Sequence, residues 1–258
     1  MLSDQHQNIA VHNLSSPKRF GIHLQLIYGG HMANKKSVTS NDVPKWHRLK
    51  GALVEINPDP KDDDFILNIQ QQQAEQEIMQ QVWMARQDVY NKIYPEVKTF
   101  ENDPHDSSAC VIYTRTKTGK ISSTARIAFD GLLGIPEKNL VPAMIGQFRD
   151  NDVQFAELGR FVIDDAARGV LPNYFRAFYQ LGKQLDIDTY IMFVRHKWVS
   201  FYIRLMKATV VAHIEENFGS DSPYAVMTWN LKDTTPRFFS WCGAESDARG
   251  TAEGEENV

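Results

Sequence analysis

Residues 154–207 alternate between strand-like and helix-like patterns, and this alternation constrains the fold more than any other part of the chain. A strand, a turn, a helix, a second strand and a second helix are predicted at residues 156–164, 165–172, 173–185, 189–194 and 197–207. This order is typical of α/β domains, whose ligands bind near strand ends. Because Glu157 and Arg160 are polar residues within the apolar first strand, we expect the functional site on that strand.

The segments around this unit add one long helix and further strands. Apolar residues at one-turn spacing predict a helix that begins near Ile66 and ends near Ile93. A hairpin is predicted at residues 109–114 and 121–129, and more strands at 209–214, 224–229 and 237–241. We therefore expect an α/β (α+β) fold in which helices flank a mixed sheet.

The two ends of the chain differ in composition from its middle. Residues 1–60 are rich in Ser, Asn, His, Lys and Asp, which predicts a polar N-terminal extension that is loosely ordered or packs on the domain as a lid. Residues 243–258 are rich in Gly and Glu and predict a disordered acidic tail. The folded domain is expected at residues 61–242, a length that permits an ample core.

Composition argues against several classes of protein and site. The formal net charge is −4, so the chain lacks the polybasic surface typical of nucleic-acid-binding proteins. The eight histidines are scattered and no HExxH or CxxC motif occurs, so we expect neither a metal site nor a permanently bound cofactor. The apolar runs are too short to form a transmembrane segment, and the first twenty residues lack an apolar signal core. We expect a cytoplasmic protein.

Four groups of polar residues follow one another along the predicted domain. They are Arg86 with Tyr90 on the first helix, Asp103 with Asp106 in the next loop, Arg126 in the hairpin, and Glu157 with Arg160 on the central strand. In this order they resemble the polar residues of the autoinducer (acyl-homoserine lactone) synthases and of the long-chain N-acyl amino acid synthases. The resemblance covers Trp83 to Trp229. It implies the Gcn5-related N-acyltransferase (GNAT) fold, with a mostly antiparallel central sheet and helices on both faces.

Two positions depart from the homoserine-lactone synthases. Their tryptophan between the first-helix arginine and the acidic pair is absent here, where Phe100 is the only nearby bulky aromatic residue beyond Tyr94. Ser123 stands where they have a glycine. Both departures weaken the resemblance to the homoserine-lactone synthases more than the resemblance to the broader group.

The central strand carries the expected chemistry. In a regular strand Glu157 and Gly159 share one face and Arg160 points to the other. A bulge at Leu158 or Gly159 would bring Glu157 and Arg160 toward one side and leave a backbone N–H group unpaired. The resemblance implies that this N–H group polarises a thioester carbonyl, an effect worth about 10²–10³ in rate.

Individual side chains also have expected roles. Glu157 is the candidate base for the acceptor amine, and the resemblance implies that Tyr202 on the last helix is the acid for the leaving thiolate, with a structural place in the core as its alternative. The expected substrate-binding residues are Arg86, Asp103, Asp106, Arg126, Leu158, Gly159 and Arg160. Arg126 and Arg160 either bind the acceptor's carboxylate or pair with Asp103 and Asp106 in a buried ion-pair network, and the sequence leaves both arrangements open.

The turn after the central strand indicates the acyl donor. Acetyltransferases of this fold hold the pyrophosphate of coenzyme A on the backbone of a glycine-containing turn. Here Arg168 and Gly169 are present, but the second small residue is missing and Pro172 removes an N–H donor. The resemblance therefore implies acyl-phosphopantetheine on acyl carrier protein as donor, with acyl-coenzyme A as the alternative. The expected donor-binding residues are Phe161, Val162, Arg168 and Gly169.

An acidic carrier protein would bind a basic face of the enzyme. The candidates for that face are Arg168, Arg176, Lys183, Arg195, Lys197, Arg204 and Lys207. Each of them is also compatible with an ordinary solvated surface.

The sequence thus predicts an N-acyltransferase that moves a long fatty acyl group from acyl carrier protein to the amino group of an amino acid or a similar small amine. The enzymatic alternatives are a homoserine-lactone synthase, whose acceptor is S-adenosylmethionine, and a coenzyme A-dependent acetyltransferase. The non-enzymatic alternative is an acyl-carrier-binding regulatory module with the same fold.

Overall fold

The computed structural model describes residues 44–59, 66–72, 75–93, 103–214 and 223–244. Most of the predicted N-terminal extension, the predicted tail from residue 245 onward, Tyr94 and Phe100 lie outside these residues. Within the described part of the chain, no helix is long and apolar enough to cross a membrane.

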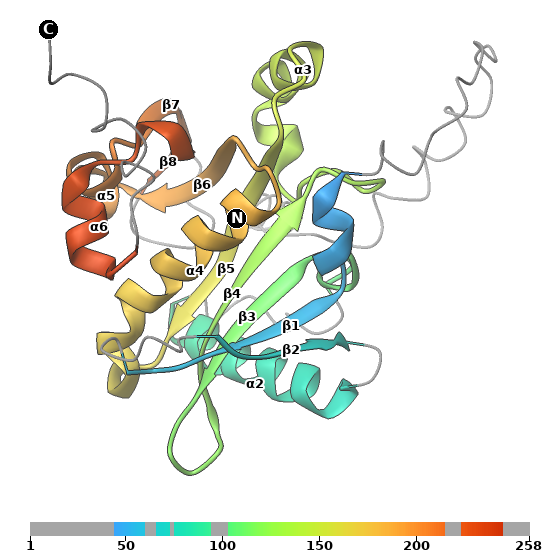
Figure 1. The fold of residues 1–258 in the computed structure, drawn as a ribbon, viewed down its shortest axis with the longest axis vertical. Helices are drawn as coiled ribbons and strands as arrows, with labels where there is room; N and C mark the ends of the chain where they lie inside the picture. Colours follow the sequence, from blue (N-terminus) through green and yellow to red (C-terminus); the bar gives the residue numbers. More distant parts are fainter. Residues whose placement is uncertain (1–43, 60–65, 73–74, 94–102, 215–222, 245–258) are drawn as a thin grey trace, which may run out of the picture.

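The described strands form a single eight-stranded sheet (Figure 1). They are β1 (Ala52–Ile56), β2 (Ile66–Gln71), β3 (Cys110–Arg115), β4 (Ile121–Phe129), β5 (Phe155–Ile163), β6 (Thr189–Arg195), β7 (Thr209–Ile214) and β8 (Tyr224–Asn230). Their order is β2-β1-β3-β4-β5-β6-β8-β7, and only the pairs β1–β3 and β5–β6 are parallel. The predicted mixed, mostly antiparallel sheet is confirmed.

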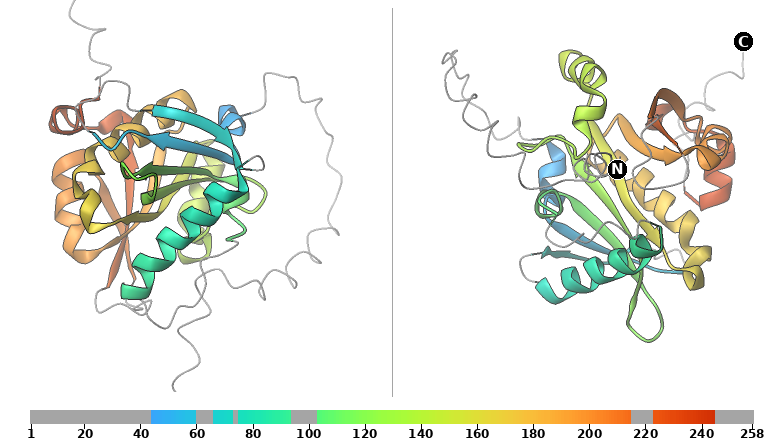
Figure 2. Two further views of the ribbon diagram at one scale, coloured as in Figure 1. Left: turned by 90° about the horizontal axis from the view of Figure 1, so that it is seen from below. Right: turned by 180° about the vertical axis from the view of Figure 1, so that it is seen from behind.

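Helices cover both faces of this sheet. They are α2 (Gln76–Ile93), α3 (Pro142–Asp150), α4 (Leu171–Gln184), α5 (His196–Met206) and α6 (Pro236–Cys242). Leu53 packs with Met79 of α2, whereas its neighbour Val54 belongs to the cluster that contains Tyr174 of α4. Successive side chains of a strand point to opposite faces, so α2 and α4 lie on opposite sides. Figure 1 shows α4 in front of the sheet, and the view from behind in Figure 2 shows α2 in front.

The N-terminal part of the sheet differs from the prediction. Residues 66–71, expected to begin the first helix, form β2, in which Ile69 pairs with Val54 of β1. The helical spacing predicted for this segment holds only from Gln76 onward, because pairing with β1 outweighs local propensity before it. Since β1 lies inside the expected N-terminal extension, the expected boundary at residue 61 separates two paired strands.

The C-terminal element also differs. Residues 237–241, expected to be a strand, belong to helix α6. Pro236 occupies its first turn, and the hydroxyl of Thr235 caps it by accepting the N–H of Phe238 at 3.2 Å. The hairpin of β3 and β4, the unit from β5 to α5, and strands β7 and β8 lie where the sequence predicted them.

Candidate active site

A pocket opens where β5 and β6 diverge. Their parallel pairing begins with Phe155 opposite Thr189 and ends with Leu158 opposite Met192. A cavity of about 360 Å³ lies between residues 157–161 of β5 and residues 192–195 of β6, and side chains from α2, α4, α5, β8 and the loop before α3 complete its lining. The strand on which the sequence predicted a functional site therefore forms one wall of this pocket.

A β-bulge distorts β5 along this wall. On β4 one residue separates Thr124 from Arg126, whereas two residues separate their partners Val162 and Gly159 on β5. Arg160, the first of these two, has a φ of +51°, which residues other than glycine rarely adopt. The bulge therefore begins one position later than predicted. The ion pairs of Arg160 hold this backbone conformation in place.

Three arginines and two aspartates form a buried ion-pair network beside β5. Arg86 Nη1 donates to Asp106 Oδ2 at 2.6 Å. Arg126 Nη1 bridges the two carboxylates, at 2.7 Å from Asp103 Oδ2 and 3.1 Å from Asp106 Oδ1. Arg160 donates to the same Asp103 oxygen from Nε at 3.0 Å and from Nη2 at 2.8 Å. Of the two arrangements that the sequence left open, these contacts form the ion-pair network.

The network carries a surplus positive charge. Burial alone would raise the pKa of Asp103, but the guanidinium groups of Arg126 and Arg160 outweigh it and hold that pKa well below its usual range. Burial likewise opposes ionisation of Asp106, and Arg86 and Arg126 lower its pKa. Three guanidinium groups thus face two ionised carboxylates at neutral pH, which leaves one positive charge next to the pocket.

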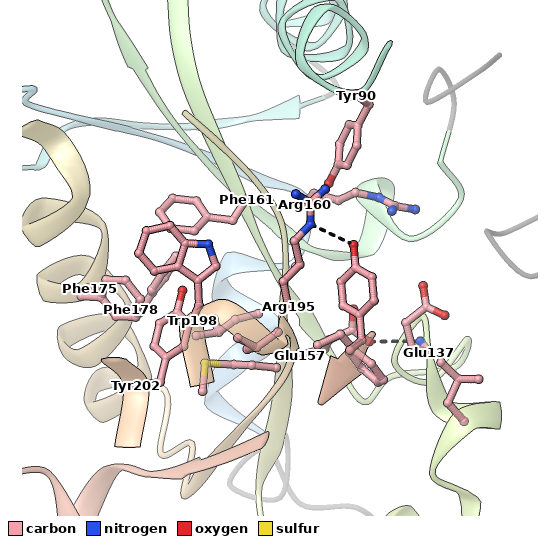
Figure 3. Close-up of a pocket in the computed structure, with 17 residues that line it drawn as sticks. Tyr90, Glu137, Glu157, Arg160, Phe161, Phe175, Phe178, Arg195, Trp198 and Tyr202 are labelled. Carbon is pink, nitrogen blue, oxygen red and sulfur yellow. Dashed lines mark hydrogen bonds between the residues drawn. The ribbon is translucent and has the colours of Figure 1, made fainter. Parts of the chain in front are cut away.

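Glu157 is a buried carboxyl group in the pocket lining. Its Oε2 accepts the backbone N–H of Glu137 at 3.0 Å (Figure 3). Burial and the nearby Glu137 raise the pKa of Glu157 to about 7, although Arg126 and Arg160 oppose this shift. A carboxyl group with such a pKa can take up and release a proton near neutral pH, as a general base must.

The sequence did not single out Glu137, Arg195 or Tyr224 for the pocket, yet all three line it. Glu137 lies in a loop punctuated by Gly and Pro, where no periodic pattern marks a functional residue. Burial raises the pKa of its carboxyl group, while Arg160 and Arg126 act in the opposite direction. Arg195 is the last residue of β6, and the sequence grouped it only with surface cations.

Aromatic side chains occupy the side of the pocket away from these carboxyl groups (Figure 3). They are Phe161, Phe175, Phe178, Trp198 and Tyr202. The Tyr202 ring centre lies 5.7 Å from that of Phe175, and burial raises the pKa of the Tyr202 hydroxyl to about 12. Tyr202 is therefore protonated at neutral pH. The aromatic side of the pocket suits an apolar chain.

A sequence comparison decides which family the chain belongs to. Residues 81–230 match the family model described as N-acyl amino acid synthase FeeM. The chain is a member of the FeeM family. The matched segment runs from α2 to the end of β8 and so includes both the network and the pocket. A comparison with curated protein sequences finds no significant match.

Solved structures share the fold of this FeeM-family chain. FeeM itself, an N-acyl amino acid synthase from uncultured soil microbes, is 17% identical, with a TM-score of 0.51 over 65% of this chain and 96% of that one. The AHL synthase LasI is 15% identical, with a TM-score of 0.53 over 68% of this chain and 93% of that one. The predicted GNAT-like fold and the predicted resemblance are confirmed, and the chain is an N-acyltransferase of this family.

In this N-acyltransferase the predicted substrate-binding residues divide into two groups. The pocket lining contains Leu158, Gly159 and Arg160. The ion-pair network contains Arg86, Asp103, Asp106, Arg126 and again Arg160. Arg160 therefore connects the network to the pocket, with a side chain that is 9% exposed.

The predicted donor-binding residues are more dispersed. Phe161 lines the pocket, whereas Val162 is buried where β5 pairs with β4. Gly169 is exposed in the 3₁₀ turn Asp165–Val170, and the side chain of Arg168 lies outside the described part of the structure. Among the described residues, no three His, Cys, Asp or Glu side chains are grouped so that they could hold a metal ion.

Replacing Gly159 by alanine tests the placement of Glu157. An added Cβ atom would lie 3.0 Å from Glu157 Oε1, closer than side chains normally approach, so we expect the carboxyl group to be displaced. Because we expect Glu157 to act as the base, its displacement should lower kcat by about tenfold or more. The control is Gly146→Ala in α3, where, apart from its chain neighbours and the backbone of its own helix, no described atom lies within 4 Å of the added methyl group. Equal kcat values for the two variants would contradict this placement.

Proposed function

We propose that this protein joins a fatty acyl group to the amino group of an amino acid, with acyl carrier protein as the acyl donor. The observation that carries the proposal is a buried carboxyl group, Glu157, with a pKa of about 7, in a pocket whose other side is aromatic. This combination supports a substrate pair with one apolar member and one basic member. Membership in a family described as N-acyl amino acid synthases supports the same product class.

Glu157 and Tyr202 divide the proton transfers of the proposed reaction. Glu157 takes one proton from the acceptor's ammonium group, directly or through water. The neutral nitrogen attacks the thioester carbonyl carbon, an N–C bond forms, and the nitrogen loses its second proton. The C–S bond then breaks with its electron pair on sulfur. The Tyr202 hydroxyl donates its proton to that sulfur and regains, through water, the second proton lost by the nitrogen, while Glu157 releases the first proton to solvent. The products are an amide and a free thiol.

The negative charge that develops on the carbonyl oxygen needs a hydrogen-bond donor. The candidates are the peptide N–H groups of Gly159 and Arg160, which follow the last β5–β6 pair on the pocket wall. The surplus positive charge of the adjacent ion-pair network favours the same developing anion. In this proposal, Arg86, Asp103, Asp106 and Arg126 hold the bulged strand and its charge in place.

Two features favour acyl carrier protein over coenzyme A as donor. Pro172 lies in the first turn of α4, where its missing N–H removes one donor from a helix terminus that would bind a pyrophosphate. Lys183 of α4, Lys197 of α5 and the adjacent Lys207 are exposed on elements that border the pocket. Exposed cations on these elements favour association with an acidic carrier.

We expect the pH dependence of kcat to report Glu157. Because only the carboxylate form accepts a proton, kcat at saturating acceptor should rise with pH and show an inflection near 7, the raised pKa of this group. Glu157→Gln should abolish this inflection and leave any later rise caused by the acceptor amine. An unchanged inflection in that variant would assign it to another group.

The donor is tested by incubating the purified protein with matched acyl-carrier and acyl-coenzyme A thioesters, an amino acid panel, and a reagent for free thiol. We expect thiol release to depend on the amino acid and to be faster with the carrier thioester. Faster turnover with coenzyme A would overturn the proposed donor. Carrier binding without turnover of either thioester would instead support the non-catalytic carrier-binding alternative.

A further inference from the structure

The proposed reaction leaves one proton in the pocket at every turnover. The acceptor enters as an ammonium ion and leaves as an amide, so its nitrogen loses two protons, of which the thiol product keeps one. The other is bound to Glu157, which is only 3% exposed. Glu157 must give up this proton before it can act as a base again. Because the residue has so little contact with solvent, the proton needs a route out of the pocket.

Glu137 lies beside Glu157, on the loop before α3. Its backbone N–H donates to Glu157 Oε2 at 3.0 Å, so its side chain begins next to the buried carboxyl group, and both residues line the same cavity (Figure 3). Unlike Glu157, Glu137 is partly exposed. A carboxyl group in this position can exchange protons with the base and with solvent, directly or through one water molecule.

The carboxyl group of Glu137 is not used to hold the fold together. It forms no hydrogen bond or ion pair with any residue that the structure describes, whereas arginine side chains hold both Asp103 and Asp106. Burial raises the pKa of Glu137, and the charge of Asp103 adds to this shift, while Arg160 and Arg126 oppose it. The pKa of Glu137 is therefore shifted in the same direction as that of Glu157, which favours proton exchange between the two groups.

We propose that Glu137 carries the proton of each turnover from Glu157 to solvent. The O–H bond of protonated Glu157 breaks, the proton binds to the Glu137 carboxylate directly or through a water molecule, and Glu137 then releases it to solvent. Both carboxylates are regenerated, and one proton leaves for each amide formed. This inference rests on the proposed N-acylation and names the residue that restores its base. Glu137 acts through Glu157 and needs no contact with the substrate.

The test is Glu137→Gln, which removes the titrating group and keeps the backbone N–H that holds Glu157. In weakly buffered solution near pH 7, kcat for thiol release at saturating amino acid should fall by about 10², the lower end of the range for a side chain that transfers protons, and KM should change little. Phosphate added at constant ionic strength should restore part of the rate, because the buffer replaces the missing carboxyl group. Glu137→Asp should retain more activity than Glu137→Gln.

The matched control is Glu77→Gln, an exposed glutamate of α2 outside the pocket lining, whose kcat should equal that of wild type at every phosphate concentration. An unchanged kcat in Glu137→Gln would overturn the inference. A loss of kcat that phosphate does not relieve, or a raised KM with an unchanged kcat, would also overturn it, because Glu137 would then serve structure or acceptor binding. Failure of wild type to acylate any acceptor would instead overturn the proposed function.

Discussion

Replacing Glu157 by glutamine is expected to lower kcat by about 10²–10⁴, the usual contribution of a general base. The fold should tolerate the change, because glutamine has the same shape and the wild-type carboxyl group, with a pKa of about 7, is already partly neutral at physiological pH. The measurements are steady-state kinetics with a thioester donor and thermal unfolding of both proteins.

The unfolding data have an expected sign as well. The folded-state pKa of Glu157 lies above the ordinary value of 4.5, so the folded state favours its protonated form, and wild type should lose stability as pH rises through about 7. The Glu157→Gln variant has no carboxyl group at this position, so its stability should lack this loss as pH rises through about 7. The matched control is Glu77→Gln, an exposed glutamate of α2 outside the pocket. A wild-type kcat in Glu157→Gln would remove this residue from the mechanism.

Replacing Asp106 by asparagine is expected to destabilise the fold by about 3–5 kcal/mol, the cost of breaking a buried ion pair from one side. Its carboxylate accepts from Arg86 at 2.6 Å, from Arg126 at 3.1 Å and from Trp83 Nε1 at 3.1 Å. Without it, three guanidinium groups would share the single carboxylate of Asp103 in a buried region. Denaturant unfolding monitored by circular dichroism measures the loss.

The control for Asp106→Asn is Asp130→Asn, which breaks an ion pair of similar length that is more exposed to solvent. Asp130 and Arg149 also form an ion pair at 2.6 Å, but the arginine side chain is 51% exposed. Asp130→Asn should therefore cost about 0–1 kcal/mol. If Asp106→Asn were as mild as this control and lowered only kcat/KM, the aspartate would act on substrate, and the network would not be the support of the bulged strand.

The sequence predicted the parts of the fold that depend on local pattern. The unit from β5 to α5 was predictable because its periodicity changes between strand and helix across clear Gly and Pro breaks. The strand β2 was not, because its six residues are specified by pairing with β1 and their spacing also fits a helix. The helix α6 is a seven-residue segment in which the caps, Thr235 and Gly243, outweigh its aromatic, strand-like composition.

From the residues alone, the pocket was predictable where charge stands out against an apolar pattern, and the family resemblance added Phe161 and Tyr202. Glu157 and Arg160 do so on β5, whereas Glu137 lies in an irregular loop and reaches the pocket only through the tertiary fold. Arg160, the first residue of the bulge, pairs with Asp103, which lies 57 positions away in the sequence. A contact between residues so far apart leaves no pattern in the sequence near either of them.

We propose that this FeeM-family chain makes N-acyl amino acids. Its most direct test is mass spectrometry of the products formed when the purified protein is incubated with an acyl-carrier thioester, an amino acid mixture and S-adenosylmethionine. We expect an N-acyl amino acid, with one thiol released for each molecule formed and little product from Glu157→Gln. Free fatty acid from hydrolysis, or an acyl-homoserine lactone, without any N-acyl amino acid would contradict it.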